Sequence, residues 1–94
     1  MLNDESRNDS VAVGTASVLV SPEKARKELI ITNTSTGGQI ITLGVGQAAA
    51  ALRGIVLTPY GVYYASMTNN FNPTTQQIFA IASAAGGTLA VFER

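Results

Sequence analysis

The side chains that could do acid–base or ionic chemistry are few in this sequence, and most of them lie near its ends. The chain has six Lys and Arg, six Asp and Glu, and no His or Cys. The acids are Asp4, Glu5, Asp9, Glu23, Glu28 and Glu93. Between Leu29 and Phe92 the only acid or base, tyrosine hydroxyls aside, is Arg53. The side chains most often used for general acid–base and thiol chemistry are therefore missing.

The remaining acids offer one arrangement that could be catalytic, a pair of carboxylates of the glycosidase type. Such a pair would have to come from Glu23, Glu28 and Glu93, and these could lie close together if the last strand pairs near the second. Ion pairs with neighbouring basic side chains, Arg26, Lys27 or Arg94, are the use that we expect instead. We therefore predict no catalytic residues and no enzymatic activity.

The same composition argues against several kinds of ligand and partner, namely metals, cofactors, nucleic acid and membranes. Lack of His and Cys, and of acids in the Asn-rich stretch 69–72, predicts no metal site. The glycines do not form a phosphate-binding loop, so we predict no cofactor. A charged fraction of 13% with zero net charge argues against nucleic acid. No apolar run reaches the ~18 residues that span a membrane, which predicts no membrane partner.

The elements that would position these residues are strands, because β-branched and apolar residues alternate between turn signals. Residues 1–10 are polar and predict a flexible N-terminal arm, and residues 11–94 predict a single domain. Three hairpins are expected, across the turns at 34–38, 58–61 and 84–87. The pattern predicts an all-β protein, a small antiparallel β-sandwich or jelly-roll-like barrel of six to eight short strands.

Strand alternation divides the apolar residues between two faces. The expected core consists of Leu29, Ile31, Ile41, Leu43, Ile55, Leu57, Val62, Tyr64, Phe79, Ile81, Leu89 and Val91. The residues expected on the opposite face or in exposed turns are interface candidates: Ile30, Thr32, Ile40, Thr42, Val56, Tyr60, Tyr63, Ile78 and Phe92. Such a face could be the uncharged surface of a monomer, or it could be covered by other subunits, where charged residues are depleted. We favour coverage and predict a homo-oligomer.

Four stretches of the chain carry a family resemblance. These are "ARKELIITNTS", "QIITLGVGQAA", "LRGIVLTPYG" and the terminal "QQIFAIASAAGGTLAVFER". Together they resemble small virion structural proteins of tailed bacteriophages, and they look most like capsid decoration, or cement, proteins. Those proteins are β-sandwich or jelly-roll-like domains bound to the outside of the capsid. The resemblance covers most of the chain after about Ser21, and it carries over no catalytic residue.

The resemblance implies a function and a location. It implies a non-enzymatic virion protein, made in the bacterial host cytoplasm, that decorates and stabilises a capsid by bridging its subunits. Its partners would be the major capsid protein and sister copies. The alternative is a phage tail or head-fibre module that binds another virion protein or a host-surface glycan, the glycan through Tyr60, Tyr63 and the Asn-rich loop.

Overall fold

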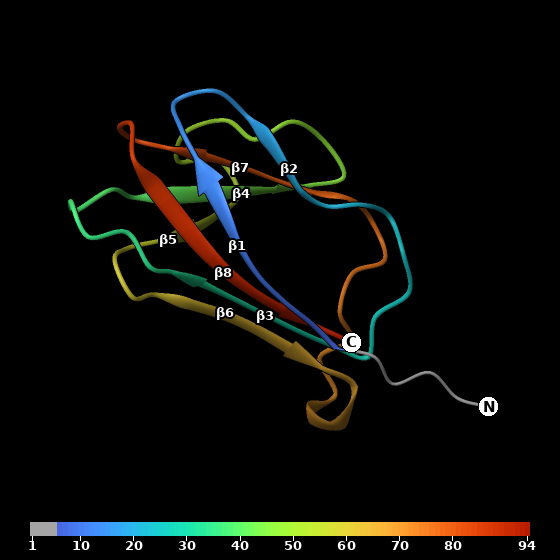
Figure 1. The fold of residues 1–94 in the computed structure, drawn as a ribbon. Coiled ribbons are helices and arrows are strands. Elements are labelled where there is room, and N and C mark those ends of the chain that lie inside the picture. Colours follow the sequence, from blue (N-terminus) through green and yellow to red (C-terminus); the bar gives the residue numbers. More distant parts are fainter. Residues whose placement is uncertain (1–5) are drawn as a thin grey trace.

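The protein is an all-β sandwich of two four-stranded antiparallel sheets (Figure 1). A computed structural model describes residues 6–94. The elements are β1 (Arg7–Val13), β2 (Val18–Ser21), β3 (Glu28–Asn33), β4 (Ile41–Val45), β5 (Ile55–Leu57), β6 (Val62–Ser66), the 3₁₀ turn η1 (Met67–Asn69), β7 (Ile78–Ala82) and β8 (Gly87–Glu93). No helix in this described part is long and apolar enough to cross a membrane.

The strands pair in a nested order. β1 pairs with β8, β2 with β7, β3 with β6 and β4 with β5, all antiparallel. Two further pairings, β3 with β8 and β4 with β7, join these ribbons into sheets of order β1-β8-β3-β6 and β2-β7-β4-β5. We call them the β1 sheet and the β2 sheet. Eight strands wound in this way form a jelly roll, which confirms the predicted fold class.

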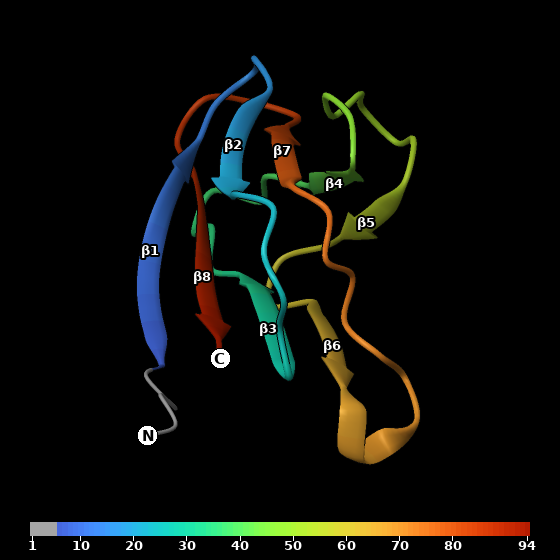
Figure 2. The same ribbon diagram turned by 90° about the vertical axis from the view of Figure 1, so that its right-hand side faces the viewer.

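The three hairpins expected from the sequence are wrong. β3 and β4, β5 and β6, and β7 and β8 each lie in different sheets, so every one of these turns carries the chain across the sandwich (Figure 2). Within residues 6–94 the only consecutive strands that pair are β4 and β5. The turn residues were recognised correctly, but a turn signal does not state whether the next strand stays in the same sheet.

Asn33 shows why the chain crosses the sandwich after β3. Its side chain is fully buried, and its amide donates to the backbone oxygens of Gln39 and Leu57, both at 2.9 Å. Its side-chain oxygen accepts from the Ser35 amide at 3.0 Å. These bonds tie the end of a strand in the β1 sheet to backbone groups beside β4 and β5. A buried polar side chain thus fixes the crossing.

The core lies between the sheets and contains all six residues expected from β3, β4 and β8, together with Leu57 of β5. Its buried members are Val13, Val20, Leu29, Ile31, Ile41, Leu43, Leu57, Ile78, Ala80, Ala82, Leu89 and Val91. The expected phase is reversed in two strands. In β7 the inward residues are Ile78, Ala80 and Ala82 rather than Phe79 and Ile81, and in β6 Val62 and Tyr64 face outward.

The boundary of the expected N-terminal arm also needs correction. Strand β1 begins at Arg7, so residues 7–10 of the range 1–10 pair with β8 in the sheet. Residues 1–5 lie outside the described part of the chain. Polar residues on an edge strand carry no apolar alternation, which is why Asn8, Asp9 and Ser10 did not indicate a strand.

Candidate interaction surfaces

The outer surface of the β1 sheet combines apolar and uncharged polar side chains and is almost without charge. Register places Tyr64, Ile30, Phe92 and Asn8 side by side across the four strands. The next row contains Val62, Thr32, Ala90 and Ser10. We call these eight positions the uncharged face.

Charge appears only at one end of this surface. Glu28 begins β3 and accepts from the Arg94 guanidinium at 2.6 Å. Among the described residues, no other outward position of β1, β3, β6 or β8 carries a charged side chain. Depletion of charge across a whole sheet face is the composition found at the centre of protein–protein interfaces.

The outer surface of the β2 sheet is covered in part by the loop 46–54, which we call the alanine loop. Its Ala49 amide donates to the Ser17 hydroxyl at 2.9 Å, and its Leu52 amide donates to the Thr42 hydroxyl at 3.0 Å. Gly44 lets the loop approach, since a Cβ there would lie 2.8 Å from the Cα of Ala49. The loop therefore lies directly on β4.

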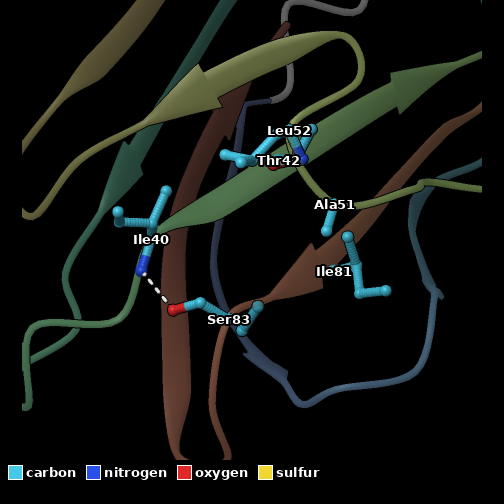
Figure 3. Close-up of a pocket in the computed structure, with 7 residues that line it drawn as sticks. Ile40, Thr42, Ala51, Leu52, Ile81 and Ser83 are labelled. Atoms are coloured by element: carbon cyan, nitrogen blue, oxygen red, sulfur yellow. Dashed lines mark hydrogen bonds between the residues drawn. The ribbon is translucent and has the colours of Figure 1, made fainter.

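A groove of about 280 Å³ runs beside this loop (Figure 3). It is lined by Ile40, Thr42, Ala51, Leu52, Ile81, Ala82 and Ser83. The Ile40 amide donates to the Ser83 hydroxyl at 3.0 Å at one end of it. The groove contains no charged side chain, so a ligand there would be held by apolar contact.

A cluster of ion pairs around a buried carboxylate, which we call the ion cluster, closes one end of the sandwich. Glu93, the last residue of β8, is 1% exposed and contacts three cations. Arg7 and Lys24 each lie 2.7 Å from its carboxylate, and Arg26 lies at 2.9 Å. Ser21 also donates to it at 2.9 Å. The expectation that the acids form ion pairs is confirmed for Glu93 with Arg26 and for Glu28 with Arg94.

Arg26 connects this cluster to the surrounding backbone. Its side chain is fully buried and donates to Glu93, to Ser21 at 2.6 Å and to backbone oxygens of two segments, 22–24 and 74–76. The accepting oxygens include those of Pro22 at 2.8 Å, Thr74 at 2.6 Å and Gln76 at 3.1 Å. The guanidinium thereby joins the ends of β2 and β8 to the chain before β7.

The cluster determines the ionisation of Glu93. Burial by itself would raise the pKa of this carboxyl, but hydrogen bonds from Lys24, Arg7, Arg26 and Ser21 outweigh it and lower the pKa to about 2. A carboxylate with so low a pKa stays ionised and cannot act as a general acid near neutral pH. Its surroundings therefore point to a structural role.

Two of the three acids considered for a catalytic pair, Glu28 and Glu93, lie on opposite sides of the β1 sheet. Glu93 faces into the sandwich, whereas Glu28 starts β3 on the outer surface beside Arg94. Within residues 6–94 no three acidic side chains gather in a way that could hold a metal ion. Glu93 is instead paired with Arg7, Lys24 and Arg26, and Glu28 is paired with Arg94.

The nine interface candidates do not share one surface. Ile30, Thr32 and Phe92 share the uncharged face. Ile40 and Thr42 line the groove, with Val56 beside Thr42 on β5. The remaining candidates lie in neither surface: Tyr60, Tyr63 and Ile78.

Two of the nine, Ile78 and Tyr63, were assigned to the wrong face, and a third, Thr42, lies on the outer face but is not exposed. Ile78 is 1% exposed and belongs to the core. Thr42 is 2% exposed because the alanine loop covers it. Tyr63 packs against the core, and its ring meets Phe71 edge-on at 6.0 Å between centroids. Burial raises the pKa of the Tyr63 hydroxyl.

Sequence reasoning missed Tyr64 and Val62, which are 43% and 55% exposed on the uncharged face. The signal was present but ambiguous, because "VYYAS" has bulky apolar residues in both phases. The one clue was Ala65, a small apolar residue that is buried between the sheets. Its position indicates that Tyr63 and Ala65, and not Val62 and Tyr64, face the core.

Comparison with known proteins identifies no relative. No protein-family model, no curated protein and no solved structure matches the chain.

Proposed function

We propose that this protein is a non-enzymatic virion structural protein that decorates a bacteriophage capsid and stabilises it by bridging capsid subunits. The observation that carries the proposal is the uncharged face, which has the composition of a covered surface although it lies on the outside of the sandwich. The sequence resemblance supplies the setting, with the major capsid protein and sister copies as partners at the capsid surface.

Two further features support a binding protein over an enzyme. The ionised groups near the core are engaged in the ion cluster, where Glu93 is fully paired. The jelly roll is also a fold used by viral capsid proteins, although it serves lectins and enzymes as well, so the fold alone does not decide the function.

The alternative is a tail or head-fibre module that binds a glycan. Tyr60 is 70% exposed in the turn before β6, but Tyr63 packs inward, and the Asn-rich stretch follows η1 at the other end of β6. A strand of five residues separates the two ends by about 16 Å. The Tyr63 ring does meet Phe71 of this stretch at 6.0 Å between centroids. Tyr60 lies at the opposite end of the strand, so the three parts do not share one compact sugar-binding site.

Reconstitution on capsid shells tests the proposal. Shells of the phage that encodes the protein, prepared without it, are mixed with purified protein, and bound copies and the shell disruption temperature are measured. We expect saturable binding and a higher disruption temperature. Absence of binding, or binding that leaves the temperature unchanged, would contradict the proposal.

Two matched variants locate the contact. Thr32→Lys places one charge in the middle of the uncharged face, and Val56→Lys places one charge on a strand of the β2 sheet. Circular dichroism first establishes that both fold. We expect Thr32→Lys to weaken shell binding and Val56→Lys to bind like the unmodified protein, because burying an unpaired charge is costly. The reverse pattern would assign the contact to the β2 sheet.

A further inference from the structure

The four edge strands of the sandwich are not equally protected against pairing with another strand. β1 carries Arg7 and Asp9, and β2 has a bulge between Leu19 and Ser21 and is followed by Pro22. β5 has only three residues. Charges, bulges, proline and shortness are the devices by which edges avoid adding strands. β6 has five residues and none of these devices, and it borders the β1 sheet (Figure 1).

Hydrogen bonds at the two ends of the β3–β6 ladder show which groups of β6 are open. The Asn33 amide donates to the Gly61 oxygen, and the Met67 amide donates to the Lys27 oxygen. Bonded pairs alternate along an antiparallel ladder, so residues 63 and 65 also face β3. The backbone groups of Val62, Tyr64 and Ser66 therefore face away from it.

One of these three positions is already closed. The Ser66 oxygen accepts from the Phe71 amide at 3.3 Å, where the chain turns back after η1. Within residues 6–94 no backbone partner occurs for the outward groups of Val62 and Tyr64. Each chain thus offers two amides and two carbonyl oxygens, two residues apart, at the free edge.

We propose that β6 pairs with β6 of a second copy, antiparallel about a two-fold axis at position 63. This register sets Val62 of each chain opposite Tyr64 of the other. The four open groups of each chain then form four hydrogen bonds, and none is left over. A centre at Tyr64 would instead require the Ser66 oxygen that Phe71 occupies. A self-complementary edge of this kind is what a two-fold dimer needs.

Side chains on the same edge suit this pairing. Val62 and Tyr64 both lie on the uncharged face, and an aromatic residue opposite a β-branched one is a favourable cross-strand pair. The two β1 sheets would become one eight-stranded sheet, and the uncharged faces of the two copies would be continuous. An unrelated extended peptide could use the same groups, but the open stretch is short and gives it few contacts.

This inference rests on the proposed function only for its setting, since it specifies how sister copies contact one another. Its test uses the isolated protein in solution, without shells. The contact is one short strand from each copy, so we expect a weak dimer that strengthens when both copies are held on one surface.

A charge-swap pair tests both the contact and its register, with sedimentation equilibrium as the readout. In the variant V62K/Y64K each lysine faces a lysine of the other copy, whereas in V62K/Y64E each lysine faces a glutamate. We expect V62K/Y64K to weaken the dimer roughly tenfold or more, and V62K/Y64E to recover most of that loss at low salt. Circular dichroism at low concentration checks that both variants fold.

Three outcomes would overturn the pairing. They are an unmodified protein that remains monomeric at its highest soluble concentration, equal weakening of the dimer by both variants, and an unchanged dimer in V62K/Y64K. Shell binding by a strictly monomeric protein would remove the pairing and leave the proposed function intact. A protein that forms the dimer but never binds shells would support the pairing and contradict the proposed function.

Discussion

Replacing Glu93 by Gln should destabilise the protein far more than its small change in shape suggests. The substitution keeps the side chain's size but removes the charge that Arg26, Arg7 and Lys24 surround. Arg26 would remain buried without its anion, and removing one partner of a buried ion pair typically costs about 3–5 kcal/mol. The loss should be comparable to the contribution implied by the carboxyl's low pKa.

That contribution follows from the same structure. Burial opposes ionisation, but the hydrogen bonds of the cluster lower the pKa of Glu93 from 4.5 to about 2. At 1.36 kcal/mol for each pKa unit, the carboxylate contributes about 3 kcal/mol to the free energy of unfolding. Because the unfolded chain binds the proton more tightly, this stability is present above about pH 4.5 and is lost as the pH falls toward about 2.

Urea unfolding followed by circular dichroism measures the effect between pH 7 and pH 2. We expect Glu93→Gln to lose about 3 kcal/mol at pH 7, and we expect its difference from the unmodified protein to shrink below about pH 4.5. Glu28→Gln is the matched control, since the Glu28–Arg94 pair is partly exposed and should contribute less than about 1 kcal/mol. Equal losses in the two variants, or a difference independent of pH, would refute the reasoning.

Three other substitutions test separate parts of the fold. Asn33→Asp removes the amide that donates to two backbone oxygens across the sandwich, and we expect a loss of about 1–3 kcal/mol in thermal or urea unfolding. Gly44→Ala should displace the alanine loop at a cost of about 1–3 kcal/mol, seen as faster hydrogen exchange of the Leu52 amide; unchanged exchange would contradict the close approach. Tyr63→Phe should reduce the loss of stability above about pH 10, because burial raises the pKa of this hydroxyl and the unfolded chain releases its proton first. An identical alkaline profile would place the hydroxyl in water.

The sequence allowed the fold class and the phase of β3 to be predicted, because Leu29 and Ile31 alternate with less buried residues in a β-branched run. It did not allow the phase of β7, since "IFAIA" is apolar at every position and either face could be the core. The coverage of Thr42 depends on the alanine loop, which follows β4 and folds back over it. Sheet membership likewise depends on long-range pairing and on the buried bonds of Asn33, which no local turn pattern contains.

The sequence predicted the candidate surfaces where strand alternation was clear, and it did not predict contacts made by residues far apart in the chain. Ile30 and Phe92 were placed on one face because their strands have clear alternation, and register brings them side by side. Glu93 was expected to form ion pairs, but its burial was not foreseen. A charged residue at the end of a chain predicts exposure, and only the closure of the sandwich end by Arg26 reverses that expectation.

The nested pairing of the strands also sets the order in which the chain can fold. Among the described strands, β4 and β5 are the only consecutive ones that pair with each other, so theirs is the pairing with the shortest loop to close. Each outer pair brings together more distant segments, and Arg7 and Glu93, in the outermost pair, are 86 residues apart along the chain. Because loop closure costs more entropy as the sequence separation of the paired strands grows, we expect β4 and β5 to pair first and the pairs β3–β6, β2–β7 and β1–β8 to form after them in that order. The ion cluster, which lies in the outermost pair, would then form last. Mutations in it should mainly accelerate unfolding and leave the folding rate almost unchanged.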